Sequence, residues 1–312
     1  MPRALPFSAD FDQRIGVSPL PLERTVVFRD ARYADEIRLK RELLAEDHSY
    51  YFRDIPASMV AQWEALDFVL DAAVRSPAFY KRDDRQRVWS NPSRDEERRF
   101  LFGDEASLPY APLDFAGRHV QEDLLLLDPT SKLVAGQLCF ANGWSLEEKL
   151  GRTFLAAHEP LPGEFASLLR TADRFLERMP PGRSFTRTNW AIRVTDRLDL
   201  SMRWNAWYRD RLADVGARLN ASNAGELLYL RIEDQTLTRL PRTAHILFTI
   251  RTTSRTLDDA LADPTDADVF LSHLRQTPTS VLDYKLISPV IPALMDYLVN
   301  RVETARHSKK IA

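Results

Sequence analysis

Two segments in the second half of the chain alternate between apolar and polar side chains, which is the period of a half-buried β-strand. Residues 226–234 carry an apolar side chain at every second position from Leu228, and residues 245–252 do so from Ile246. Three further segments have strand character: residues 124–127, 133–140 and 188–195. A turn signal at Asp128-Pro129 separates the first two of these. The pattern predicts an antiparallel sheet in the second half of the molecule.

Helical periodicity lies before and after these strands, in residues 34–44, 56–74, 163–179 and 288–305. Pro180-Pro181-Gly182 is expected to end the third helix. The proline-containing first thirty residues are expected to form an extended arm, and the charged residues 81–99 a solvated helix or loop. The predicted class is α+β. We expect an arm and helical region in residues 1–118 to pack on a core of residues 119–312, as one integrated domain.

Composition excludes several classes of function. The 43 basic and 45 acidic residues give a net charge of −2, so no overall field would attract nucleic acid or a membrane surface. The apolar runs are too short to cross a bilayer, and the first residues lack the apolar segment of a signal peptide. A single cysteine, Cys139, excludes an internal disulfide and a multi-cysteine metal site. These features predict a cytoplasmic protein that binds neither nucleic acid nor membrane.

The six histidines contain no pair at a metal-binding spacing. His48, His273 and His307 lie in polar, helix-like surroundings and are expected at the surface. His158 differs, because it stands between an apolar stretch and a turn fixed by prolines. The residues alone leave two interpretations of His158: a packed, hydrogen-bonded side chain or a ligand.

A second cluster of polar residues lies along the predicted strand that contains Glu233. On an extended strand Arg231, Glu233 and Gln235 share one face, opposite the apolar set. One interpretation is a solvated sheet face with cross-strand ion pairs. The other is a pocket wall that carries an acid and a base.

Several motifs around these clusters resemble those of the haem-dependent oxidative N-demethylase family. The similarity runs in order from about residue 120 to residue 253. The matching residues are Cys139-Phe140, Trp144, Lys149, Gly151, His158, Pro160, Pro162, Arg187, Asn189-Trp190, Arg231, Glu233, Gln235-Thr236-Leu237, Arg239-Leu240-Pro241 and Phe248-Thr249-Ile250-Arg251-Thr252.

The resemblance implies a PAS-like antiparallel sheet with helical N- and C-terminal extensions that holds haem b. It also implies an enzyme that oxidises a secondary amine such as dimethylamine with O2. The electrons would come from flavin- and ferredoxin-type reductase proteins. The oligomeric state is left open. Two other functions remain: a PAS-like haem sensor without turnover, and a structural family member that has lost haem.

The same resemblance assigns roles to individual residues. His158 is expected to bind the iron, with its other ring nitrogen held by a carbonyl or carboxylate. Glu233 and Arg231 are the catalytic candidates, with Glu233 binding the ammonium group or relaying protons. The remaining candidates for cofactor binding are Lys149, Arg187, Trp190 and Arg239. Arg152 and Arg242 are further candidates for pairing with the haem propionates. Trp144 is a further candidate for a wall of the pocket.

The chain departs from the family pattern at three places. Asp234 stands where a basic residue is usual, Thr253 replaces a tyrosine, and Ala141-Asn142-Gly143 replaces a proline-containing turn. A charge change beside Glu233 leaves a substrate other than dimethylamine open. The basic stretches at residues 81–99 and 301–310 are candidate docking surfaces for an acidic redox partner.

Overall fold

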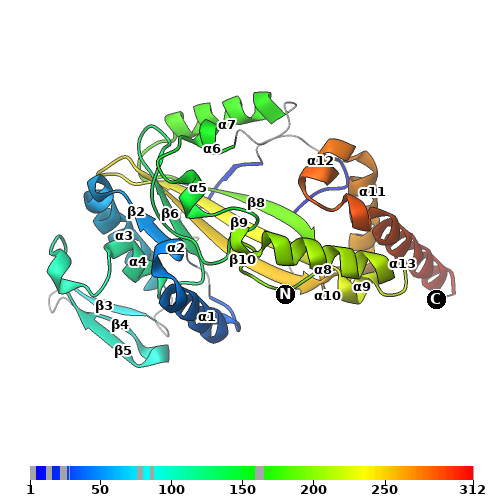
Figure 1. Ribbon diagram of the computed structural model, residues 1–312, viewed down its shortest axis with the longest axis horizontal. Helices are drawn as coiled ribbons and strands as arrows, with labels where there is room; N and C mark the ends of the chain where they lie inside the picture. The colour runs from blue at the N-terminus through cyan, green and yellow to red at the C-terminus, as the bar shows by residue number, and fades with distance from the viewer. Residues whose placement is uncertain are drawn as a thin grey trace.

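The computed structural model describes residues 5–11, 16–21, 27, 29–75, 80–84, 88–158 and 165–311. A seven-stranded antiparallel sheet crosses the molecule in the order β1-β8-β9-β10-β6-β7-β2 (Figure 1). In that order the strands are β1 (Ser18–Pro19), β8 (Ser184–Arg193), β9 (Tyr229–Arg239), β10 (Ile246–Thr256), β6 (Asp123–Leu127), β7 (Leu133–Gln137) and β2 (Phe52–Asp54).

The sheet confirms the α+β class and the five strand candidates, with changed boundaries. β9 begins at Tyr229 because Glu226 belongs to a short helix, and β8 extends toward the N-terminus as far as Ser184. β2 pairs with β7 and β1 with β8, so the N-terminal region contributes both edge strands. The PAS-like assignment and the division at residue 118 stay predictions.

Thirteen α-helices occur in the described part of the chain. They are α1 (Tyr33–Glu46), α2 (His48–Tyr51), α3 (Met59–Ala73), α4 (Pro112–Gly117), α5 (Leu146–Lys149), α6 (Phe154–Ala157), α7 (Ala166–Arg178), α8 (Asn205–Arg218), α9 (Ala224–Leu227), α10 (Leu257–Ala260), α11 (Pro264–Gln276), α12 (Thr279–Tyr284) and α13 (Ile291–Ile311). The four predicted helices correspond to α1, α3, α7 and α13. Helices α8 and α11 were not predicted individually.

The two faces of the sheet are covered by different helices. On one face, Leu124 and Leu126 of β6 join a core with α1 and α3, and Ile232 of β9 joins a core with α11 and α13. The other face carries α5, α6 and α7. In Figure 1, α7 lies at the top of the molecule, and α11 to α13 lie at the end opposite β3 to β5. The face under α5 to α7 positions the candidate site.

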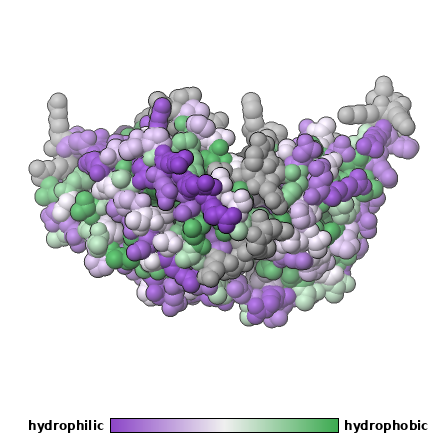
Figure 2. Space-filling model, turned by 90° about the horizontal axis from the view of Figure 1, so that it is seen from above, coloured by the Kyte–Doolittle hydropathy of each residue, from purple (hydrophilic) through white to green (hydrophobic). Residues whose placement is uncertain are grey.

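Helix α7 is strongly amphipathic, yet its apolar side is incompletely covered. Leu176 is buried, whereas Leu168, Leu169 and Phe175 are only half-buried. Seen from above in Figure 2, hydrophilic residues gather where α7 lies, as expected for its outer side. Pro180 follows soon after the last helical residue, Arg178, as predicted. The inner side of α7 therefore presents apolar surface that the protein itself does not fully bury.

Residues 81–99 are a correction to the sequence interpretation. They form a three-stranded antiparallel sheet, β3 (Lys81–Asp83), β4 (Val88–Asn91) and β5 (Glu96–Arg99), rather than a solvated helix or loop. The sheet forms because every second residue of β4 is buried, including Trp89, which is only 2% exposed. Mixed charge on the outer positions concealed this short alternation.

His273 is a second correction. It is buried rather than at the surface, because it packs against the rings of Phe7 and Trp190 and its Nδ1 lies 2.9 Å from the Ser8 carbonyl oxygen. His307 is exposed as predicted, and Cys139 is fully buried. Of the predicted N-terminal arm, residues 5–11, 16–21, 27 and 29–30 are described, and Ser18–Pro19 form β1. Residues 163–164, at the start of the third predicted helix, lie outside the described residues. No helix among the described residues is both long and apolar enough to cross a membrane.

Candidate functional site

Glu233 lies near the middle of β9 on the sheet face under α5 to α7. Strand register places Asn189 of β8 beside it on one side and Thr252 of β10 on the other. Asn189 Nδ2 donates to Glu233 Oε2 at 3.3 Å, and Gln235 Nε2 donates to the same oxygen at 3.1 Å. Two amides therefore fix one oxygen of the carboxylate and leave Oε1 without a hydrogen bond to the described residues.

Arg231 is buried behind Glu233 and is engaged mainly with backbone. Its guanidinium donates to the carbonyl oxygens of Phe140 at 2.6 Å and Arg197 at 3.2 Å, and its Nε lies 3.7 Å from Glu233 Oε1. Burial lowers the pKa of Arg231 to about 10, so it stays charged at neutral pH. Arg231 ties β9 to neighbouring loops and holds positive charge close to the carboxylate.

His158 follows α6 and has the hydrogen bonding expected of a metal ligand. Its Nδ1 lies 2.8 Å from the Phe154 carbonyl oxygen, and its ring packs on the Phe154 ring at a centroid distance of 4.4 Å. Burial lowers the pKa of His158 to about 4, so the imidazole is neutral at pH 7. The carbonyl selects the tautomer with the proton on Nδ1, which leaves the Nε2 lone pair for a ligand bond.

His158 lies over the same sheet face as Glu233, because its ring packs on Phe154, which joins the apolar cluster on that face. Lys149 and Arg187 oppose protonation of His158, and the Glu233 carboxylate favours the charged form of each cation. Burial lowers the pKa of both cations. Lys149 Nζ also lies 4.6 Å from the centre of the Trp144 ring, which places Trp144 beside the site.

Unpaired polar atoms gather on the Glu233 face of the sheet. The buried side-chain atoms without a hydrogen-bond partner among the described residues include, on this face, Arg187 Nε, Arg231 Nε, Gln235 Oε1, Arg239 Nε, Thr252 Oγ1 and Ser254 Oγ. Buried polar atoms are normally paired, so this group of unpaired atoms on one sheet face is consistent with a ligand site there. The half-buried apolar side of α7 covers the same face.

The other predicted site residues have different placements. The Trp190 side chain lies on the opposite sheet face, against Phe7 and Phe270, because it alternates with Asn189 and Ala191. Arg239 shares the Glu233 face at the far end of β9, where it donates to the carbonyl oxygens of Leu176 and Ala244. Arg152 is exposed, and Arg242 pairs with acids of α3. Pro160 and Pro162 lie outside the described residues.

The departures from the family pattern also have defined positions. Asp234 and Thr253 are on the face opposite Glu233, where Thr188 donates to Asp234 Oδ1 at 3.3 Å. The charge at Asp234 therefore does not face the carboxylate side of the site. Asn142 accepts a hydrogen bond from Arg193 Nε at 3.0 Å, and Gly143 has a φ of +81°, which suits a turn that lacks proline.

Sequence reasoning missed Asn189 as a partner of Glu233. Asn189 was visible only as part of a motif, since strand register cannot be read from one sequence. It also missed Lys285, which follows α12 and donates from Nζ to the Trp190 carbonyl oxygen at the edge of β8. Nothing in the local sequence marks Lys285, because its partner lies far away along the chain.

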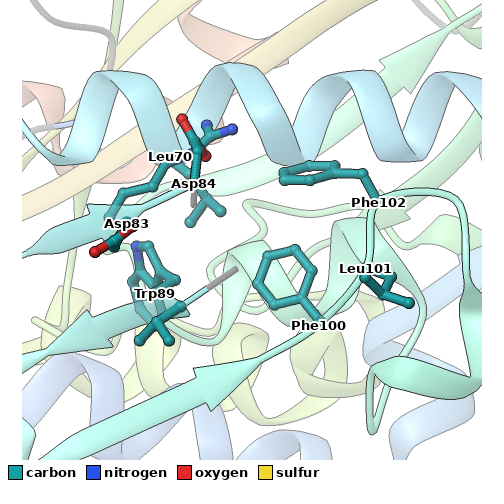
Figure 3. A pocket seen from close by; sticks show the side chains of 9 residues that line it. Leu70, Asp83, Asp84, Trp89, Phe100, Leu101 and Phe102 are labelled. Carbon is teal, nitrogen blue, oxygen red and sulfur yellow. The ribbon is translucent and has the colours of Figure 1, made fainter. Parts of the chain in front are cut away.

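Two surface hollows, of about 300 and 580 Å³, lie against β3 to β5 and share Trp89 as a wall. Figure 3 shows the smaller one, in which the rings of Trp89, Phe100 and Phe102 face a common space. Neither hollow includes a residue of the site around Glu233. No group of three potential metal-ligating side chains occurs among the described residues.

A family model for haem-dependent oxidative N-demethylase, alpha subunit-like proteins matches residues 21–295 of the chain. The chain belongs to this family. The match covers every strand of the seven-stranded sheet except β1, and all the residues around Glu233 and His158. It extends well beyond the motif region of residues 120–253, and it indicates an oxidative, haem-dependent family that includes partner subunits.

The residues of the site fit a haem group. His158 would supply one imidazole ligand, α7 and the sheet would supply apolar surface, and Lys149 and Arg187 would supply charge for the two propionates. The carbonyl partner expected for His158 is that of Phe154. A haem-free structural role would leave the unpaired polar atoms around Glu233 without a purpose.

Proposed function

We propose that this chain is a haem-dependent monooxygenase that removes an N-methyl group from a secondary amine. The observation that carries the proposal is a neutral imidazole, His158, held at Nδ1 by a carbonyl over the sheet face that also carries the Glu233 carboxylate. Family membership supports the oxidative chemistry. Haem b is the proposed cofactor, and flavin- and ferredoxin-type proteins are the proposed electron donors.

In the proposed reaction one atom of O2 enters a C–H bond of the N-methyl group. The other atom leaves as water, with two electrons from the reductase and two protons. The resulting carbinolamine then breaks its C–N bond and gives the demethylated amine and formaldehyde. Bound haem supplies the activation of O2, and the protein supplies orientation, charge and protons.

Each described side chain has a proposed part in this chemistry. His158 would hold the iron through Nε2 while the Phe154 carbonyl fixes the ring. Lys149 and Arg187 would bind the propionates. Glu233 Oε1 binds the substrate ammonium or holds a proton, and the amides of Asn189 and Gln235 keep the carboxylate in place. Arg231 is a positioning residue, because its donors contact backbone carbonyls rather than the open side of the site.

Formaldehyde release tests the proposal directly. The haem-loaded protein is incubated with a surrogate flavin–ferredoxin reductase, NADPH and dimethylamine or a larger secondary methylamine. We expect formaldehyde in proportion to the amine consumed, and none without the reductase. A haem-loaded protein that is reduced, binds O2 and releases no formaldehyde from any amine tested would contradict an enzymatic role and favour a sensor.

A further inference from the structure

Four neighbouring side chains at the centre of the site are buried and incompletely hydrogen-bonded. Strand register pairs Glu233 of β9 with Thr252 of β10, and Arg231 with Ser254, so all four lie on one face of two adjacent strands. Each residue is at most 9% exposed. Arg231 Nε, Thr252 Oγ1 and Ser254 Oγ have no hydrogen-bond partner among the described residues. Glu233 Oε1 has none there either, because both bonds to this carboxylate end on Oε2.

Cross-strand hydroxyl groups on the opposite face of the same sheet satisfy one another. Thr236 of β9 and Thr249 of β10 are register neighbours, and their hydroxyl groups form a hydrogen bond. Ser184 of β8 and Thr238 of β9 are also register neighbours, with 2.8 Å between their hydroxyl oxygens. Buried hydroxyl groups are normally paired in this way. The unpaired hydroxyl groups beside Glu233 are therefore not a general property of the sheet.

The amides that hold Glu233 explain why Thr252 lacks a partner. Asn189 and Gln235 donate to Glu233 Oε2, and Asn189 lies on β8, on the side of β9 away from β10. Glu233 Oε1 lies 3.7 Å from Arg231 Nε, which is too far for a hydrogen bond. Opposed residues on neighbouring strands have Cβ atoms about 4.5–5.5 Å apart. A single water molecule can therefore contact two or more of these side chains.

The unpaired atoms have the complementarity that a bound water molecule needs. Arg231 Nε is a donor, Glu233 Oε1 is an acceptor, and a hydroxyl group is both. A buried water molecule makes about three hydrogen bonds to groups that are otherwise unpaired. A substrate ammonium fits less well, because it offers only donors and is repelled by the Arg231 guanidinium. The group is therefore suited to water and to the movement of protons.

The group extends from the middle of the sheet toward the surface. Ser254 is 7% exposed, whereas Thr252 is fully buried. The exposed Arg32 donates to the Ser254 carbonyl oxygen at 3.1 Å, so this end of β10 lies close to solvent. The order Ser254, Thr252, Glu233 therefore leads inward from near the surface to the carboxylate.

We propose that Ser254 and Thr252, with bound water, form a proton relay that ends at Glu233 Oε1. This inference rests on the proposed function, and it gives Glu233 the role of proton carrier rather than ammonium ligand. Conversion of the amine and O2 into the carbinolamine and water consumes two electrons from the reductase and two protons. Each proton enters at Ser254 and moves inward as each hydroxyl group releases one proton and accepts another. Glu233 then gives it up to the water that forms.

A high-resolution crystal structure of the full-length protein tests for the bound water. We expect an ordered water molecule within hydrogen-bond distance of both Thr252 Oγ1 and Glu233 Oε1, and a second contact of this water with Arg231 Nε. This water should be absent from Thr252→Val. A gap without ordered water in the wild-type protein would overturn the relay. A haem propionate in direct contact with Thr252 Oγ1 would overturn it as well.

Removal of one hydroxyl group tests the movement of protons. In haem-loaded Thr252→Val, which keeps the shape of the side chain, formaldehyde release should be about tenfold slower or more. Its solvent deuterium isotope effect should increase, because proton transfer then limits the rate. Thr252→Ser should restore most of the rate. Thr253→Val removes a hydroxyl group at the next position, on the opposite face, and should behave as wild type.

The outcomes for the relay and for the proposed function are distinguishable. A wild-type rate in Thr252→Val, or a slower rate with an unchanged isotope effect, would overturn the relay and leave the proposed function standing. Loss of haem from Thr252→Val would also overturn the relay and assign this hydroxyl group to cofactor binding. Absence of formaldehyde from the wild-type protein would instead remove the proposed function, and the relay with it.

Discussion

The two faces of the central sheet treat buried charge in opposite ways. On the face toward α1, Arg251 of β10 is 3% exposed and contacts Glu36 Oε2 and Asp30 Oδ2, each at 2.8 Å. On the face toward α7, Arg187 and Lys149 have no acidic partner among the described residues, and several buried polar atoms there lack hydrogen bonds. The first cation is neutralised within the protein, whereas we propose that a bound ligand neutralises the second set.

The comparison separates structural charge from functional charge within a single sheet. Adjacent positions on β8, such as Asn189 and Trp190, lie in different environments because successive side chains of a strand point to opposite faces. Substitutions on the α1 side should therefore change the free energy of unfolding. Substitutions on the α7 side should change haem binding and turnover.

The largest expected effect is that of His158→Ala. Removing the only proposed axial ligand should reduce bound haem from about one per chain to near zero, while the far-ultraviolet circular dichroism spectrum stays the same. His245→Ala is the control, because His245 is a half-buried histidine at the start of β10. Haem that is kept in His158→Ala and lost in His245→Ala would move the axial role to His245.

Glu233→Gln should reduce turnover of the amine by about 10²- to 10⁴-fold with little change in haem content, since the amide cannot accept a proton or balance an ammonium charge. Formaldehyde release and the pyridine haemochromogen assay measure the two quantities. Glu147→Gln changes an acid of α5 whose side chain is 65% exposed and should leave both unaltered. Turnover equal to wild type in Glu233→Gln would make this carboxylate structural.

Arg251→Met should lower the free energy of unfolding by about 3–5 kcal/mol, because Glu36 is left buried without its cation. Urea unfolding monitored by tryptophan fluorescence checks this value in the haem-free protein. If the two faces have different roles, the haem affinity of Arg251→Met should change little. The affinity is measured under conditions in which the protein is fully folded. A drop in haem affinity without a drop in stability would reverse the roles assigned to the faces.

Arg187→Met should weaken haem binding with little effect on the free energy of unfolding. Haem dissociation, followed by transfer to apomyoglobin, should become about tenfold faster. The haem-free protein should be as stable as wild type or slightly more stable, since an unpaired, partly buried cation has been removed. Arg170→Met, on the exposed side of α7, serves as the matched control. A large loss of stability in the haem-free Arg187→Met protein would show that Arg187 is a structural residue.

The smallest expected effect concerns His119, a buried histidine away from the site. Burial lowers the pKa of His119 to about 3, below its usual value near 6.5. Between these values the unfolded chain binds a proton that the native protein does not, so stability falls as the pH decreases, by at most about 1.4 kcal/mol per pH unit. His119→Phe should reduce this slope between pH 6.5 and 5 in urea titrations. An unchanged slope would assign it to other groups.

The sequence predicted the strands and long helices because their apolar periods are regular. It also placed Arg231, Glu233 and Gln235 on one face, since alternation along a strand is a local property. It did not predict the small sheet of residues 81–99, where the buried positions of the four-residue β4 are only Trp89 and Asn91. Local periodicity is visible in a sequence, whereas isolated buried positions are not.

The remainder of the site depends on long-range contacts. Asn189 meets Glu233 through strand register, and Lys285 reaches the edge of β8 through the path of the chain after α12. The wrong surface assignment of His273 has the same origin, because its partner Ser8 is 265 residues away. For the same reason Trp190 was predicted as a cofactor contact from its motif alone, without the knowledge that its side chain faces the opposite core.

The absorption spectrum of the protein expressed with ample haem supply tests the central claim most directly. We predict a Soret band that corresponds to about one haem per chain, with the reduced and CO-bound spectra of a histidine-ligated haem. Absence of a Soret band after reconstitution with haem would contradict the claim that the α7 face of the sheet is a haem site. That result would leave the chain as a structural member of its family.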